Sequence, residues 1–347
     1  MKLVFKVLRW AYTAACAIAL ASVAAAQHAE LPKYVAAKQV SGAIHICGSP
    51  QMSELLKVYE QGFVKVQPAV HFENELKSTL TAVSGVYTGR ADIGLLGREI
   101  WPTEIQAFES IKGHPPTVID VATGSFDVPK ATFALMIFVP KSNPIASLSI
   151  EQLERIFTAS NEASGNSPIR TWGDIGLRGD RAKRPIHLYG FNVDNDKAQI
   201  FSQLIFSKGE RWNPALKEFS NSPGPNSADA GESIVQAVAN DPDAIGISNV
   251  HYATSSVKAL ALSTPEQKVP VAPTRETVAS RAYPLTRALY MVVNNDAGHL
   301  PSEAAIEFLH FILSRQGQEA VMQEGNYLPL TAEIALRQLR QLPTASK

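Results

Sequence analysis

The stretch AIHICGSPQMSELLKVYEQGF, residues 43–63, constrains the fold of this chain more than any other. Its first part, Ala43–Cys47, is short, apolar and partly β-branched, which is typical of a buried strand. The turn formers at 48–50 follow, and from Ser53 on the apolar residues recur at helical spacing. We therefore expect a strand, a tight turn and a helix. The free N–H groups at such a helix start suit an anion, although an ordinary strand-to-helix connection gives the same pattern.

The N-terminus has the pattern of a secretory signal peptide. Three basic residues precede a mostly apolar run over residues 11–21, and three consecutive alanines end at Ala26. Because the run is too short to span a bilayer, we predict a signal peptide over residues 1–26 and export to the periplasm. A retained membrane anchor is the alternative. Residues 27–40 then form a loose N-terminus of the mature chain.

Charge and cysteine content limit the partners of the mature chain. The whole chain has 32 Lys and Arg residues against 32 Asp and Glu residues, and removal of the signal peptide takes away three basic residues, which leaves 29 against 32. A mixed, mildly acidic surface argues against nucleic acid or an anionic membrane as partner. The mature chain keeps one cysteine, Cys47, and its apolar strand predicts a buried thiol rather than a nucleophile.

Short strands alternate with helical segments along the mature chain, which predicts an α/β fold with mixed, mostly parallel sheets flanked by helices. The length of the chain predicts two domains. Strands are expected at residues 43–47, 69–72, 92–96, 132–139, 185–189, 244–248 and 288–293, and helices are expected to begin near Ser53, Ser149, Asp194, Ser233 and Ser302. Residues 326–330 are expected to end the fold.

Several segments, taken in order, resemble the phosphate-type periplasmic binding proteins of ABC transporters. The first is Phe126–Pro144, FDVPKATFALMIFVPKSNP, which is similar to the segment that leads into the second lobe of those proteins. The further matching segments are Leu148–Phe157, Trp172–Gly176, Val238–Ser248, Tyr283–Tyr290 and Phe308–Leu330. Together they cover nearly the whole mature chain, and their order rather than any one segment indicates the family.

The resemblance implies a two-lobed periplasmic-binding-protein fold of type II that holds its ligand in the cleft between the lobes. Lobe 1 would combine residues 41–125 with residues 270–347, and lobe 2 would be residues 126–269. It also implies an exported solute-binding protein, not an enzyme, that captures a small anionic ligand, phosphate or a related oxyanion. The partners would be the membrane subunits of an ABC transporter. We expect a monomer with no cofactor and no metal.

In that family, loop hydroxyls, helix-start N–H groups, one Arg and one Asp hold a desolvated oxyanion. Carried over onto this sequence, the first loop corresponds to Ser49 and Gln51, and the second corresponds to Ser78 and Thr79. Because each oxygen of a buried anion needs a hydrogen bond, these hydroxyl and amide groups are the expected donors in lobe 1.

The charged positions of the family's site differ in this sequence. The family's proton-accepting Asp falls at Gly97, which Arg98 follows, and the family's Arg falls at Phe191. The residues that align with the family's Ser-Gly-Thr are Asn195, Asp196 and Lys197. An acid at this helix start would compete with an anion for the N–H groups and would repel it. We expect Arg98 and Lys197 to supply charge to the ligand, and solvated surface positions are the alternative for both.

Two other functions stay open. A sensor or interaction protein of the same fold that no longer binds phosphate is favoured by the changed Arg and Asp positions. An exported hydrolase is the other, although the sequence has no nucleophile elbow, no Walker-type loop and no metal-binding spacing among its histidines.

His45 and His71, on neighbouring predicted strands, are expected to be buried and hydrogen-bonded. Met52, Trp101 and Phe191 fit either the core or a cleft for a larger, partly apolar ligand.

Overall fold

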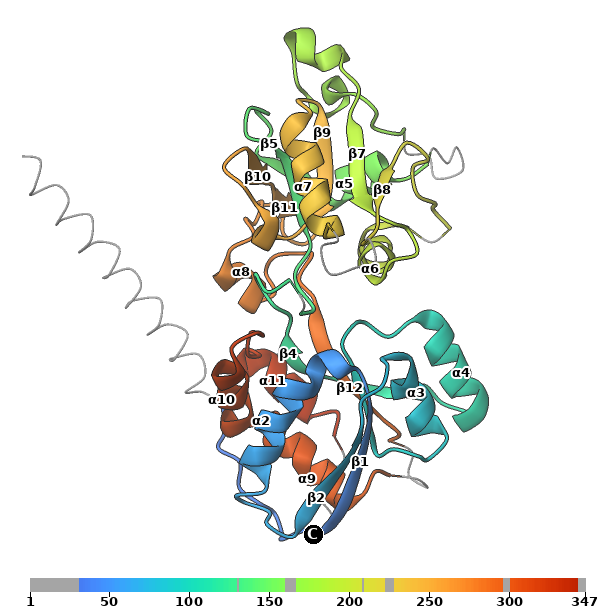
Figure 1. The fold of residues 1–347 in the computed structure, drawn as a ribbon, viewed down its shortest axis with the longest axis vertical. Coiled ribbons are helices and arrows are strands. Elements are labelled where there is room, and N and C mark those ends of the chain that lie inside the picture. Colours follow the sequence, from blue (N-terminus) through green and yellow to red (C-terminus); the bar gives the residue numbers. More distant parts are fainter. Residues whose placement is uncertain are drawn as a thin grey trace, which may run out of the picture. The chain divides into compact units, whose positions relative to one another are not determined.

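The structure is a computed structural model that describes residues 31–129, 131–159, 167–207, 209–221, 228–295 and 300–342. The predicted signal peptide and residues 27–30 lie outside the described residues. The chain divides into two compact units (Figure 1): unit 1 contains the residues up to Ala122 and those from Leu289 on, and unit 2 contains Thr123–Ala288. None of the helices in the described ranges is both long enough and apolar enough to cross a membrane.

Unit 1 is built on a mixed five-stranded sheet with the strand order β2-β1-β3-β12-β4. Its strands are β1 (Gly42–Gly48), β2 (Val70–Glu75), β3 (Ile93–Leu96), β4 (Thr117–Thr123) and β12 (Ala288–Val293). β1 pairs in parallel with β2 and β3, whereas β12 runs antiparallel to β3. Every residue of β3 is buried, as expected for a strand whose sheet is covered on both faces.

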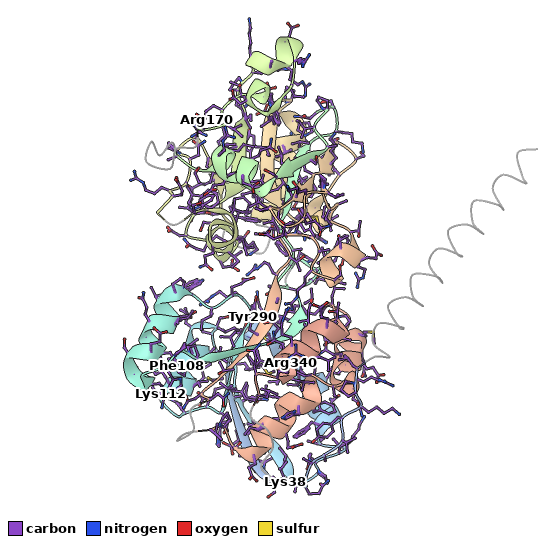
Figure 2. The ribbon with its side chains drawn as sticks, turned by 180° about the vertical axis from the view of Figure 1, so that it is seen from behind. Lys38, Phe108, Lys112, Arg170, Tyr290 and Arg340 are labelled. Atoms are coloured by element: carbon purple, nitrogen blue, oxygen red, sulfur yellow. The ribbon has the colours of Figure 1, made fainter. Side chains whose placement is uncertain are left out.

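Two groups of helices flank this sheet (Figure 1). One group consists of η1 (Pro50–Met52), α2 (Ser53–Phe63), α9 (Glu303–Ile312), α10 (Arg315–Glu324) and α11 (Ala332–Leu339), and the other consists of α3 (Leu80–Tyr87) and α4 (Pro102–Lys112). In the first group the ring of Phe63 lies 5.1 Å from that of Phe308 and 5.6 Å from that of Phe311. In the second, Phe108 is fully buried in a cluster with α3 and β3, and Tyr290 packs against it (Figure 2).

Residues 31–40 are attached to unit 1, although the sequence predicted a loose segment there. Leu31 is fully buried, and the Tyr34 hydroxyl donates to Glu307 Oε2 at 2.6 Å. The backbone N–H of Arg315 donates to the carbonyl of Pro32 at 3.0 Å. These partners come from α9 and α10, far along the chain, so no local pattern in residues 31–40 could predict the attachment.

Unit 2 contains a second mixed five-stranded sheet, with the order β10-β5-β9-β7-β8, and a small sheet formed by β11 and β6. Its strands are β5 (Met136–Pro140), β6 (Ser147–Ser149), β7 (His187–Phe191), β8 (Lys217–Phe219), β9 (Ala244–Ser248), β10 (Val257–Ala259) and β11 (Ala261–Ser263). β7 is parallel to β8 and β9, and β5 is antiparallel to β9 and β10.

Helices cover both faces of the unit 2 sheet (Figures 1 and 2). α7 (Ala230–Asn240) packs closely on β9. The absence of a side chain at Gly246 in β9 permits this approach, since a Cβ there would lie only 2.6 Å from Cγ2 of Val238 in α7. α5 (Ile150–Phe157) and α6 (Asp196–Ile205) lie on the other face, where the rings of Phe157 and Phe201 are 5.2 Å apart. The short helices are η3 (Trp172–Ile175), η4 (Gly179–Lys183), η5 (Val250–Tyr252) and α8 (Arg275–Ala279).

The two chain crossings lie at 122/123 and 288/289, whereas the sequence placed them at 125/126 and 269/270. Residues 270–288 stay with unit 2 because they bond to it. Val271 exchanges two backbone hydrogen bonds with Leu262, and Leu135 N donates to the carbonyl of Leu285 at 3.0 Å. The fold also continues beyond residue 330, where we expected it to end, because α11 follows and buries Ile334 and Ala335.

Candidate functional site

The ligand-binding residues predicted in unit 1 lie at one edge of its sheet. β1, β2 and β3 are parallel, so their carboxyl ends meet at the same edge. Ser49 and Gln51 follow β1, Ser78 and Thr79 follow β2, and Gly97 follows β3. The structure therefore brings together three loops that are far apart in the sequence.

The turn after β1 needs a glycine at its first position. Gly48 has a φ of 131°, a region that side chains rarely adopt, and a Cβ there would overlap the backbone of Leu95. Ser49 N then donates to the Leu95 carbonyl at 3.0 Å, which fixes the turn against β3. Pro50 begins η1, where the missing N–H of proline removes no intrahelical bond.

Ser49 and Gly97 are in direct contact. A Cβ on Gly97 would lie 2.6 Å from Ser49 Oγ and 3.1 Å from Gln51 Oε1. The serine hydroxyl thus takes the space in which a side chain at position 97 would begin. Ser49 is fully buried, and its Oγ has no hydrogen-bond partner among the described residues. A buried hydroxyl of this kind remains available to an acceptor that binds at the edge.

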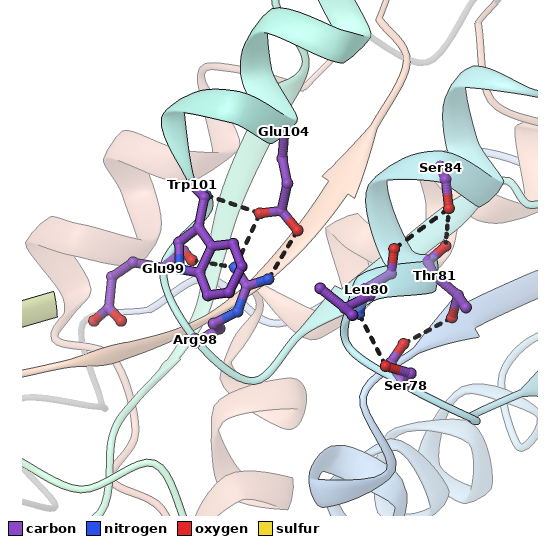
Figure 3. Close-up of polar contacts among 8 residues, drawn as sticks. All are labelled: Ser78, Leu80, Thr81, Ser84, Arg98, Glu99, Trp101 and Glu104. Carbon is purple, nitrogen blue, oxygen red and sulfur yellow. Dashed lines mark hydrogen bonds and ion pairs between the residues drawn. The ribbon is translucent and has the colours of Figure 1, made fainter. Parts of the chain in front are cut away.

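Thr79 is the N-cap of α3, and Ser78 directly precedes it. Figure 3 shows Ser78 beside Leu80 and Thr81. Ser78 Oγ accepts a hydrogen bond from Leu80 N at 3.2 Å, and the Ser78 carbonyl accepts one from Thr81 Oγ1 at 2.7 Å. Thr79 is half-buried and makes no side-chain cap. The loop is therefore held by Ser78, while the Thr79 hydroxyl is the less constrained of the two.

Arg98 forms an ion pair with Glu104 at the start of α4 (Figure 3). Its Nη1 and Nη2 donate to the two oxygens of Glu104 at 2.9 and 2.8 Å, and its Cζ lies 3.7 Å from the centre of the Trp101 ring. Glu104 also accepts the backbone N–H of Trp101 at 2.8 Å. The charge that we expected Arg98 to offer a ligand is thus balanced by a carboxylate of the protein itself.

Asn195, Asp196 and Lys197 begin α6 in unit 2, shortly after the end of β7. Asn195 Oδ1 caps the helix by accepting the backbone N–H of Lys197 at 3.0 Å. Lys197 Nζ lies 3.3 Å from Asp196 Oδ1, and Nη1 of Arg287 lies 3.8 Å from Asp196 Oδ2. Sequence reasoning missed Arg287, which reaches α6 from a distant part of the chain and has a side chain that is 1% exposed.

Asp196 stays ionised at neutral pH because of these cations. Burial by itself would raise the pKa of the Asp196 carboxyl, but Lys197 and Arg287 outweigh that effect and hold the pKa below its ordinary value. The Lys197 ammonium also lies 5.5 and 5.6 Å from the ring centres of Phe133 and Phe191. Phe191, at the position that the resemblance gives to the family's Arg, is buried, as is Met52.

A further polar cluster lies on β1 and β2. His45 Nε2 is 3.1 Å from Glu73 Oε2, and His71 Nε2 is 3.8 Å from Glu73 Oε1. The prediction of buried histidines is wrong, because the two side chains are 49% and 64% exposed. Cys47 is buried as predicted, and burial is the main cause that raises the pKa of its thiol to about 11.

A cavity of about 340 Å³ opens beside this cluster. The residues that line this cavity include His45, Cys47, Glu73 and Arg90. The structure describes every predicted ligand-binding residue, and none of them lines the cavity. Within the described ranges, no group of three or more His, Cys, Asp and Glu side chains is arranged to hold a metal ion.

Comparisons with known proteins agree with this architecture. The model of the PBP superfamily domain matches residues 35–316. The phosphate-binding protein PstS of Pseudomonas aeruginosa is 33% identical over 328 residues, which are 94% of this chain and 95% of that protein.

Solved structures show the same fold. PstS from Borrelia burgdorferi has a TM-score of 0.56 at 18% identity, and an ABC-type phosphate transport receptor from Vibrio cholerae has a TM-score of 0.53 at 20% identity. The matches cover 84% and 82% of this chain and 100% and 99% of theirs. The predicted fold class, with two lobes of mixed sheets flanked by helices, is confirmed.

Proposed function

Because this chain belongs to the PBP superfamily, we propose that it is an exported solute-binding protein that captures a small oxyanion in the periplasm. Its relation to phosphate-binding proteins over almost its whole length supports phosphate as the first ligand to test. In this proposal the protein delivers the bound ion to the membrane subunits of an ABC transporter and catalyses no reaction on it.

The observation that most directly supports an oxyanion ligand is the environment of the Ser49 hydroxyl. It is fully buried at the start of η1, makes no hydrogen bond within the described residues, and lies at the edge where three predicted loops meet. We assign Ser49, Gln51, Ser78 and Thr79 as the donors of unit 1. Each donor that a buried anion loses costs about 1–3 kcal/mol.

Calorimetric titration tests this assignment. We expect phosphate to bind wild-type protein and to bind Ser49→Ala about tenfold more weakly, because one buried donor is lost. Ser84→Ala is the matched control: it removes a hydroxyl that bonds to helical carbonyls at 3.3 and 3.4 Å in α3 of the same unit. Equal affinities of all three proteins would contradict the role of Ser49.

A second function is a sensor or interaction protein that no longer binds phosphate. Two contacts favour it, since Arg98 is paired with Glu104 and Asp196 lies at the start of α6. Titration with phosphate, sulfate, molybdate and phosphonates separates the two functions. Binding of any of these ions supports capture, and binding of none supports the sensor. Turnover of a phosphoester panel would contradict both.

A further inference from the structure

We propose that the Asp196 carboxylate is a built-in counter-anion that occupies the anion-binding groups of unit 2 and thereby limits its affinity for oxyanions. The inference rests on the proposed function for the class of ligand. It goes beyond that function because it names the residue of unit 2 that determines how strongly an oxyanion binds.

The contacts of Asp196 are those that an oxyanion would make. One carboxylate oxygen faces Lys197 Nζ at 3.3 Å, and the other faces Nη1 of Arg287 at 3.8 Å. An ammonium and a guanidinium thus converge on one carboxylate at the start of α6.

Both residues that carry the cations also have contacts other than Asp196. The Arg287 side chain is 1% exposed, and its backbone carbonyl accepts the N–H of Gly124 at 2.8 Å. Lys197 lies in the second position of α6, and its ammonium is close to the rings of Phe133 and Phe191. Removal of the carboxylate charge would therefore take away the negative charge that the Lys197 ammonium and the Arg287 guanidinium both face.

An arriving oxyanion has to displace the Asp196 carboxylate or bind beside it. Displacement breaks the two ion pairs, and binding beside it places like charges close together in a partly buried setting. Either route lowers the affinity by roughly a factor of ten or more. The wild-type chain is therefore expected to bind oxyanions more weakly than its cationic groups alone would allow.

Two isosteric variants test the proposal by calorimetry with phosphate and with sulfate. Asp196→Asn removes the charge but keeps the shape of the side chain, and it should bind phosphate about tenfold more tightly than wild type, or better. Asp194→Asn is the matched control, because Asp194 lies two residues earlier, is exposed and forms no ion pair among the described residues. It should stay within about twofold of wild type.

A second substitution identifies the groups that take the anion. Lys197→Gln in the Asp196→Asn background should reverse the gain, because one of the two positive charges is lost. Asp196→Ser serves as an additional variant if the asparagine protein unfolds, and thermal unfolding followed by circular dichroism shows whether each variant is folded.

The outcomes separate this inference from the proposed function. Equal phosphate affinity of wild type and Asp196→Asn overturns the inference and leaves the function standing. Binding by Asp196→Asn without binding by wild type supports the inference and overturns oxyanion capture by the natural chain. If neither protein binds any oxyanion, both are overturned.

Discussion

Arg98 links the loop after β3 to the first turn of α4 through Glu104, and the two side chains are only 8% and 14% exposed. Arg98→Ala leaves a mostly buried carboxylate without its partner, so we expect the free energy of unfolding to fall by about 3 kcal/mol. Urea unfolding measures this change. Arg90→Ala is the control, because Arg90 pairs with Glu75 where 72% and 51% of the side chains are exposed.

In the Arg90→Ala control the free energy of unfolding should fall by less than about 1 kcal/mol, because exposed ion pairs contribute little to stability. If Arg98→Ala is as stable as Arg90→Ala, the Arg98–Glu104 pair is not what holds α4. The sequence placed Arg98 beside the ligand because it follows the position of the family's Asp. Its pairing with Glu104 depends on how the loop turns into α4, which the spacing of charges does not determine.

Ser49 and Gly97 should be energetically coupled. Gly97→Ala would bring its Cβ to 2.6 Å from Ser49 Oγ, so we expect it to destabilise the chain by about 1–3 kcal/mol. Ser49→Ala removes the colliding oxygen, and the same Gly97→Ala change made in that background should cost at least about 1 kcal/mol less. A double-mutant cycle by urea unfolding measures the coupling, and purely additive losses would contradict the contact.

At the scale of elements, Asp241 joins β7 to the turn that follows α7. Its Oδ2 lies 2.6 Å from His187 Nδ1 and accepts the Tyr189 hydroxyl at 2.8 Å. Burial would raise the pKa of Asp241, but the N–H of Asp243, the Tyr189 hydroxyl and His187 together hold it below the ordinary value. The ionised form therefore stabilises the folded state.

This depressed pKa gives the pH dependence its sign. The stabilisation is complete above the unfolded-state pKa of about 3.9 and is lost as the pH falls through the lower folded-state pKa. Asp241→Asn should therefore be less stable than wild type at pH 7, and the difference should shrink as the pH falls from about 5 to about 2. Urea unfolding over that pH range measures the difference. A difference that does not change with pH would contradict the role of the carboxylate.

The predictability of an element depended on whether local residues alone position it. β9 and β12 were predicted to the residue, because each is a short buried run between turn formers. α10 was missed, since it has a polar sequence and depends on tertiary bonds. Its Gln318 Nε2 donates to the carbonyls of Val121 and Ile312 at 3.1 and 2.9 Å, and no periodic pattern indicates such partners.

The site was predictable in the same uneven way. The proximity of Ser49 and Gly97 follows from the rule that parallel strands share a carboxyl edge. Arg287 was not predictable as a partner of Asp196, because it arrives at the end of unit 2 after many intervening elements. The charged groups around the start of α6 could therefore be identified only from the structure.

For the whole molecule, one family relation explains the order of the segments, and the predicted ligand-binding residues are divided between the two units. Ser49, Gln51, Ser78 and Thr79 belong to unit 1, and Asn195, Asp196 and Lys197 belong to unit 2. The whole chain, rather than either unit alone, is thus the right object for a binding experiment.

The most direct measurement is equilibrium dialysis of wild-type protein against labelled phosphate, after unfolding and refolding to remove any ligand carried through purification. We expect saturable binding of one phosphate per chain, weakened about tenfold by Ser49→Ala. The absence of saturable binding of phosphate at millimolar concentration, with folding verified by circular dichroism, would contradict the claim that this chain captures phosphate.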